Sequence, residues 1–246
     1  MNDLIPLSDD NPHDITPLLT GAFFIINVLI FIFSINATDQ GIQNLYQAFA
    51  LIPAELFGKV DPNGGPPEKI TLLTSALLHG DIFHLIFNML FWIIFADNIE
   101  YAFGKIRFLL FCIASAAVSA GAQAYLDPSS TIPMIGFSGV ISAVMGAYVV
   151  LYPHAKINII NPNYSFLWSA YSSLFAFTIA IPAWLCMGIW FSRDIIGFIT
   201  IEKAPQAGGI AFAAHIAGFA FGLALGRILR INMSLYELKA MRKKRH

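Results

Sequence analysis

The chain has 246 residues, and 57% of them are hydrophobic before its 18 glycines are counted, whereas a soluble domain has roughly 45 to 50% with glycine included. This excess excludes an ordinary soluble domain and indicates a membrane protein. Only 12% of the residues are charged and the formal net charge is -1, so the balance of charge gives no sign of a nucleic-acid partner.

Apolar runs long enough to cross a bilayer occur six times. A hydrocarbon core of ~30 Å requires about 20 apolar residues in a helix. The first run has no Lys or Arg before it and no clear small-x-small cleavage site after it, so we interpret it as a permanent anchor. The sequence therefore predicts an all-α polytopic membrane protein with six transmembrane helices. The six spans are expected at 17–36, 76–98, 106–126, 134–152, 166–191 and 208–229.

Positive charges near the spans predict the orientation, because short loops rich in Lys and Arg stay on the cytoplasmic side. An even number of spans puts both termini on one side. With the termini inside, the inner flanks hold ten Lys and Arg residues and the outer flanks hold four. The short loops and the lack of a transit-like leader favour a bacterial plasma membrane with both termini in the cytoplasm. The four outer residues are Lys59, Lys69, Arg193 and Lys203.

The expected membrane domain, 17–230, has short ends and one long connection. We expect a cytoplasmic tail at 1–16 and a basic cytoplasmic tail at 231–246. The connection at about 37–75 is too apolar in its first half for a solvated loop, so we expect it to lie in the membrane interface. The basic tail fits either a segment lying against anionic lipid or a simple positive-inside signal.

Polar residues inside three spans are the strongest functional signal, because each must be solvated by protein or by a water-filled cavity. The second span contains His79, His84 and Asn88, the fourth begins IGFSGVIS with Ser138, and the sixth contains His215. These spans run in the same direction, from outside to inside, and each polar group lies in the outer part of its span. At 1.5 Å per residue, His215 lies about 10 Å into its span. We therefore expect Ser138 and His215 to share one depth.

Small residues would let the fourth and sixth spans approach closely. Gly218, Gly222 and Gly226 recur every four residues on the face of His215, and Gly139 offers a small surface on the fourth span. Such stripes also occur in membrane bundles that only pack, so by themselves they do not indicate catalysis. The histidine within the stripe favours a functional site.

Ser138 and His215 together match the chemistry of a serine hydrolase. A serine hydroxyl becomes an effective nucleophile when a neighbouring base takes its proton, and neutral imidazole suits that task near pH 7. The Ser-His-Asp template has a third member, but spans four and six contain no Asp or Glu, so we predict a dyad. Helix packing and an aromatic residue such as Tyr171 or Phe137 would then hold the imidazole.

His84 and Asn88 are candidates for stabilising an oxyanion. They are four residues apart and therefore share a helix face, and both can donate a hydrogen bond to the charge that develops during acyl transfer. The backbone N–H of Ser138, near a helix N-terminus, adds a further donor. On its own, the pair would instead indicate an interhelical hydrogen bond.

Taken together, these residues resemble the rhomboid family of intramembrane serine proteases. Glu100 and Gly104 also resemble the family's E-x-x-x-G motif. The Trp-Arg pair that many members carry in the first loop is missing, since Ile70 and Thr71 stand at about that place. Three motifs carry the resemblance, namely H-x-x-x-N at 84–88, G-x-S-G at 136–139 and A-H-x-x-G-x-x-x-G at 214–222.

The resemblance implies a role for each matching residue. Ser138 would be the nucleophile, His215 the base, and His84 and Asn88 would assist the oxyanion. It also implies an endopeptidase that cuts in or next to transmembrane helices of membrane-protein substrates and needs no cofactor. Substrates would enter between spans two and five, where Pro182 predicts a kink. The remaining motif positions would support the site: His79, Gly136, Gly139, Gly218 and Gly222.

Three other classes stay open at this point. His79, Asp81 and His84 suggest a metalloprotease, but no HExxH motif is present and a five-residue step puts the two histidines on different helix faces. A transporter or proton relay needs acidic partners inside the spans, where we find only Asp97 near an inner end. A rhomboid-like protein that binds membrane helices without cutting them would be expected to lack the serine or the histidine.

Overall fold

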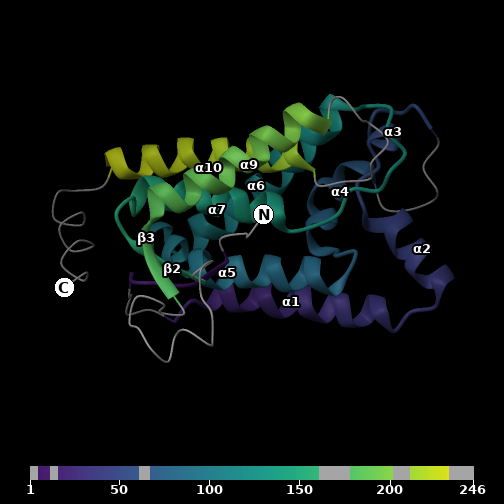
Figure 1. The fold of residues 1–246 in the computed structure, drawn as a ribbon. Helices are drawn as coiled ribbons and strands as arrows, with labels where there is room; N and C mark the ends of the chain where they lie inside the picture. The colour runs from purple at the N-terminus through teal and green to yellow at the C-terminus, as the bar shows by residue number, and fades with distance from the viewer. Residues whose placement is uncertain (1–4, 12–15, 61–66, 161–177, 202–210, 233–246) are drawn as a thin grey trace.

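Long apolar helices lying side by side form the body of the structure (Figure 1). A computed structural model describes residues 5–11, 16–60, 67–160, 178–201 and 211–232. The long helices are α1 (Leu18–Ile35), α5 (Ile82–Phe103), α6 (Lys105–Leu126), α7 (Ser138–Leu151), α9 (Ala183–Ile201) and α10 (Phe212–Asn232). Between α1 and α5 lie α2 (Asp39–Phe49), α3 (Pro53–Leu56), α4 (Glu68–Thr74) and the 3-10 helix η1 (Ser75–Leu77).

Among the described residues, four helices are long and apolar enough to cross a membrane: α1, α5, α6 and α10. Helix α7 is apolar but has only 14 residues. Helix α9 has 19 residues and carries Arg193 and Asp194 near its middle. The predicted spans at 17–36 and 106–126 agree closely with α1 and α6, whereas the span at 76–98 begins six residues before α5.

The predicted helix at 166–191 is wrong over residues 178–182 and in where it ends. Residues 178–182 form the strand β3 (Thr178–Pro182), and α9 begins at Ala183 and continues ten residues beyond the predicted end. Pro182 closes the strand and does not kink a helix, because proline disfavours helical backbone in the residue before it. The rest of that predicted span, 166–177, lies outside the described residues.

A small sheet corrects the all-α prediction. Three antiparallel strands pair in the order β1 (Pro6–Asp9), β2 (Lys156–Ile160) and β3. Ile157 and Ile159 of β2 are fully buried while Lys156 is exposed, as expected for side chains that alternate between the faces of a strand. Part of the predicted N-terminal tail is therefore a strand of this sheet.

The sheet and the end of α10 lie at the same end of the bundle. Strand β2 follows α7 directly, and β1 pairs with it. Near the end of α10, the Arg230 guanidinium donates a hydrogen bond to the Val150 carbonyl in the last turn of α7, at 2.7 Å. Ser138, at the first residue of α7, lies at the opposite end of that helix.

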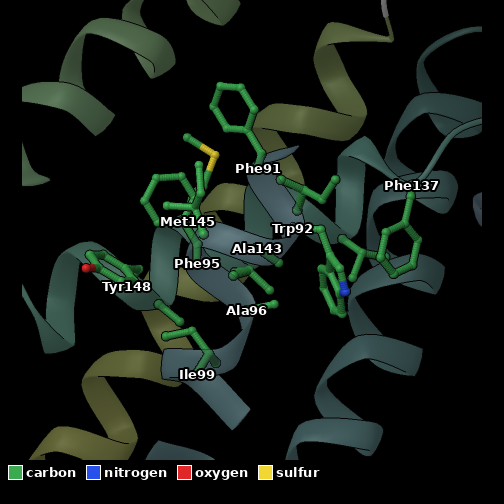
Figure 2. Close-up of a cluster of buried hydrophobic side chains, with 14 of the residues drawn as sticks. Phe91, Trp92, Phe95, Ala96, Ile99, Phe137, Ala143, Met145 and Tyr148 are labelled. Carbon is green, nitrogen blue, oxygen red and sulfur yellow. The ribbon is translucent and has the colours of Figure 1, made fainter. Parts of the chain in front are cut away.

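The core between α5 and α7 consists of aromatic and small side chains (Figure 2). The Trp92 ring packs edge-on against Phe137, with ring centroids 4.8 Å apart. Its indole N–H donates to the Thr20 carbonyl of α1 at 2.8 Å, which joins a third helix to this core. The labelled core residues are Phe91, Trp92, Phe95, Ala96, Ile99, Phe137, Ala143, Met145 and Tyr148.

Glu100 of α5 is a fully buried carboxylate whose oxygens are all hydrogen-bonded. Its two oxygens accept hydrogen bonds from the backbone N–H of Leu19, the backbone N–H of Thr20 and the Thr20 hydroxyl. The first N–H groups of a helix have no partner within the helix, and the helix dipole favours an anion there. Glu100 therefore caps α1 and fixes it against α5.

Candidate active site

Ser138 and His215 lie in direct contact. The two residues are 77 positions apart in sequence, yet Ser138 Oγ and His215 Nε2 are 2.7 Å from each other. Ser138 is the first residue of α7, and His215 lies in the first turn of α10. If the hydroxyl donates, Nε2 must be the unprotonated ring nitrogen. The geometry is that of a nucleophile beside its base.

The small residues predicted to bring α7 and α10 together lie at their interface. A Cβ atom at Gly222 would collide with the Ala143 carbonyl oxygen, and one at Gly218 would collide with the Gly139 carbonyl oxygen. A Cβ at Gly139 would itself stand 2.6 Å from the Ser119 Cβ of α6. The backbones of α7 and α10 therefore approach so closely that only glycine fits at these positions. This close helix crossing supports the Ser138–His215 contact.

Gly136 shapes the turn that presents the serine. Its φ of 125° lies in a region that side chains rarely adopt, and a Cβ there would stand 2.8 Å from the His84 ring. Its backbone N–H donates to the Ser75 carbonyl at 3.0 Å. Only glycine fits both the backbone angle and the nearby imidazole.

The first long connection holds the other side of this turn. Leu51 and Met134 exchange two backbone hydrogen bonds, of 3.1 and 2.8 Å, and Leu51 is fully buried. Met134 precedes Gly136 by two residues, so the connection after α2 fixes the backbone that leads into Ser138. Sequence reasoning did not assign this role to Leu51.

The structure brings His84 to the serine but engages Asn88 elsewhere. The His84 ring packs against Gly136, two residues before Ser138 at the start of α7. The buried Asn88 amide lies 2.9 Å from His79 Nε2, and the His79 and His84 rings meet edge to face at 5.1 Å. His79 precedes α5, so it reaches Asn88 from outside the helix. Among the described residues, one amide hydrogen of Asn88 is committed to His79 and the second has no acceptor.

Asp81 has a local structural role. Its carboxylate accepts a hydrogen bond from the His84 backbone N–H at 2.9 Å and caps the N-terminus of α5. Such a cap satisfies one of the N–H groups that a helix start leaves without a partner. Within the described residues, no group of three or more His, Cys, Asp or Glu side chains could hold a metal ion.

A pocket opens beside Ser138. It lies between α6, the serine turn and the start of α10, and it is open to solvent. Its walls are made mostly of small side chains, so the space next to the hydroxyl is shaped for a small group. Residues lining it include Ala116, Ser119, Ala120, Gly139 and Ala214.

Asp194 is a site residue that sequence reasoning missed. Its Oδ1 atom lies 3.3 Å from His215 Nδ1, on the other side of the imidazole from Ser138. The predicted fifth span ended at 191, which put Arg193 in an outer flank and left Asp194 out of the membrane. The apolar residues that resume after it, IIGFITI, were the available signal, because they extend α9 to Ile201.

Of the two aromatic residues suggested for holding the imidazole, Phe137 is found elsewhere. Phe137 packs against Phe23 and Trp92, with ring centroids 5.7 and 4.8 Å away. Tyr171 lies outside the described residues.

Comparison with known proteins identifies the relatives of this chain. The rhomboid domain family model matches residues 66–232, more than half of the sequence. Rhomboid protease GlpG from Pectobacterium atrosepticum is 33% identical over 150 residues, which are 61% of this chain and 45% of that protein. Rhomboid protease GlpG from Haemophilus influenzae is 28% identical over 156 residues, 63% of this chain and 67% of that protein.

A human relative is similar over a comparable stretch. Rhomboid-related protein 3 from Homo sapiens is 27% identical over 160 residues, 65% of this chain and 36% of that protein. The match therefore spans less than half the length of two of these three relatives. The family match and the long apolar helices together establish that this chain is an integral membrane protein and belongs to the rhomboid family.

Proposed function

We propose that this protein is an intramembrane serine endopeptidase that hydrolyses peptide bonds in or next to transmembrane helices of membrane-protein substrates. The observation that carries the proposal is the 2.7 Å contact between Ser138 Oγ and His215 Nε2. Packing alone needs no such contact, whereas acyl transfer needs a base within hydrogen-bond reach of the nucleophile. The two GlpG relatives are rhomboid proteases, which supports the same class of reaction.

The chemistry follows the order of a serine protease. Ser138 Oγ attacks the scissile carbonyl carbon while His215 Nε2 takes the hydroxyl proton, and the carbonyl oxygen becomes an oxyanion. His215 then gives that proton to the leaving amine as the carbon–nitrogen bond breaks, which leaves an acyl-enzyme. A water molecule, deprotonated by His215, hydrolyses the ester and restores the serine.

We propose three donors for the oxyanion. The Ser138 backbone N–H begins α7 and has no partner within the helix. The His84 ring lies against the turn before Ser138. The Asn88 amide, oriented by His79, has one further hydrogen to donate. Donors fixed in advance stabilise developing charge strongly because they need not reorganise during the reaction.

The proposed substrate is a membrane helix that unwinds locally. Its carbonyls are hidden in hydrogen bonds, so helix-breaking residues near the cut lower the cost of exposing one. The pocket lined by Ala116 and Ala120 favours a small side chain next to the scissile bond. We propose entry between α5 and α9, which meet through the Phe91 and Trp190 rings at 4.7 Å.

We further propose that both termini lie in the cytoplasm of a bacterial cell, with Ser138 toward the outer face. The strand β1 and the end of α10 share the end of the bundle that carries Lys156 and Arg230, which fits the positive-inside rule. A cysteine introduced at the exposed His154 should react with a membrane-impermeant maleimide only after the membrane is opened. Reaction of this cysteine in intact cells would contradict the proposed orientation.

Cleavage in a bilayer tests the proposed function. Purified protein is reconstituted into liposomes with a panel of single-span reporter proteins that carry glycine or proline within the span, and products are followed on gels. We expect wild type to cut, Ser138→Ala to leave the reporters intact and Ser142→Ala to cut like wild type. Ser142 is a matched control one turn along α7. Intact reporters with wild type, or equal cutting by Ser138→Ala, would favour a protein that binds membrane helices without cutting them.

A further inference from the structure

Both ring nitrogens of His215 face a polar partner. Nε2 lies 2.7 Å from Ser138 Oγ, and Nδ1 lies 3.3 Å from Asp194 Oδ1. Ser138 reaches the ring from α7 and Asp194 reaches it from α9, so the imidazole of α10 is held between two other helices. The side chains of His215 and Asp194 are only 15% and 21% exposed.

The contact with Asp194 belongs to a continuous seam between α9 and α10. On one side of it, the Phe191 and Phe219 rings stack with centroids 4.3 Å apart. On the other side, Phe212 packs so closely over Gly197 that a Cβ there would collide with its ring. Phe191, Asp194 and Gly197 are three residues apart along α9, so they share one face of that helix.

The order of these contacts fixes the register of the two helices. Going up α9 from Phe191 to Gly197, the partners run down α10 from Phe219 through His215 to Phe212. Asp194 lies opposite His215 because an aromatic contact on each side sets the antiparallel alignment. The carboxylate is therefore placed by packing and not by the flexibility of a surface side chain.

A carboxylate buried inside a membrane protein is costly and is usually retained for a function. Glu100, the buried carboxylate of α5, has a structural explanation because it caps α1 with three hydrogen bonds. The hydrogen-bond partner of Asp194 is instead the imidazole that touches Ser138. The position of Asp194 therefore indicates a role beside the reacting residues and not a role in capping a helix.

We infer that Asp194 is a positioning residue that holds His215 through the Nδ1–H and makes the site a Ser138–His215–Asp194 triad. This inference rests on the proposed function. An ionised carboxylate only accepts hydrogen bonds, so it selects the tautomer with the proton on Nδ1 and leaves Nε2 free to accept the serine proton. It also stabilises the imidazolium that forms when that proton is transferred.

The test measures how fast a fluorophosphonate probe labels the detergent-solubilised full chain, because this reaction needs an activated serine but no substrate. Rates are fitted to a maximal rate constant and a half-saturating probe concentration for wild type, Asp194→Asn, Asp194→Ala and Asp194→Glu. Ser192→Ala is the control on the same helix, since its hydroxyl is exposed and donates to the Ile189 carbonyl. Thermal unfolding of each variant reports folding separately.

We expect Asp194→Asn and Asp194→Ala to lower the maximal rate roughly 100-fold, the lower end of the range for a positioned acid–base group, with unchanged half-saturation and unfolding temperature. Asp194→Glu should recover part of the rate. Added formate should accelerate Asp194→Ala by supplying a carboxylate, and it should leave wild type and Ser192→Ala unaffected. A purely structural role for Asp194 would not produce rescue by formate.

Three results would overturn the inference. Labelling of Asp194→Asn and Asp194→Ala at the wild-type rate would leave the dyad and the proposed function intact and remove Asp194 from the mechanism. Slower labelling with a lowered unfolding temperature and no response to formate would assign Asp194 to packing. Wild type that stays folded without labelling would contradict the proposed function itself, and the triad with it.

Discussion

Gly136 shows how much one residue determines at this site. Its φ of 125° and the His84 ring 2.8 Å from where a Cβ would stand leave no room for a side chain. We predict that Gly136→Ala lowers the rate of fluorophosphonate labelling roughly 100-fold or more, because small displacements of reacting groups have effects of that size. Gly80→Ala is the matched control, since its Cβ would meet only Ile135 Cδ1 at an ordinary 3.6 Å. Equal labelling of the two variants would show that the turn is not needed.

Site residues could be predicted from the sequence where a polar residue interrupts an apolar run, and not elsewhere. Ser138, His215 and His84 could be found because each is a polar residue within an apolar run, and the structure brings all three together. Asp194 could not, because the neighbouring Arg193 ended the apolar run that was counted as a span. The contact between Asn88 and His79 depends on how the chain turns before α5. The spacing of residues along a helix does not predict such a turn.

The packing of α7 against α10 is the element on which the site depends. We predict that Gly222→Ala lowers the free energy of unfolding by about 1 to 3 kcal/mol, the usual cost of overpacking a tight interior. The added methyl would collide with the Ala143 carbonyl of α7. Unfolding in mixed detergent micelles measures this cost.

Gly21→Ala in α1 is the control for that prediction. Its Cβ would meet nothing within 4 Å, so the change should be neutral or stabilise by up to about 1 kcal/mol through helix propensity. If Gly222→Ala were as stable as Gly21→Ala, the close approach of α7 and α10 would not require glycine at position 222.

The long helices were predicted from the sequence, whereas the strands were missed, and the difference has a physical reason. A bilayer demands long apolar runs, so α1 and α6 stand out from the sequence alone. The strands β2 and β3 are five residues each, KINII and TIAIP. Apolar runs this short fit a strand or part of a helix equally well. Their pairing with β1 depends on contacts between distant parts of the chain.

The N-terminal segment is tied to the helix bundle through Asp9. Its Oδ2 atom accepts hydrogen bonds from the Tyr148 hydroxyl and the Asn98 amide, and Asn98 Oδ1 accepts one from the Asn11 amide. Burial raises the pKa of Asp9 to about 6, and the nearby Asp97 and Asp10 carboxyls add to this, against the Tyr148 hydrogen bond, which lowers it. Asp9 therefore couples the stability of the whole molecule to pH.

The sign of this coupling is definite. Because the folded pKa of Asp9 lies above its ordinary value of 3.8, its contribution is fully present below pH 3.8 and is lost as pH rises through about 6. From that shift we predict a loss of stability of up to about 3 kcal/mol between pH 4 and pH 7. Asp9→Asn should remove this part of the pH dependence and make the protein more stable near pH 7. Unfolding curves of both proteins across this range measure it, and identical pH slopes would contradict the coupling.

The most direct measurement for the whole account is labelling of the purified protein with a fluorophosphonate probe, comparing wild type with Ser138→Ala and His215→Ala. The 2.7 Å contact predicts that wild type labels and that both variants, still folded, do not. Failure of folded wild type to label, or equal labelling without Ser138, would contradict the claim that this membrane protein carries an activated serine.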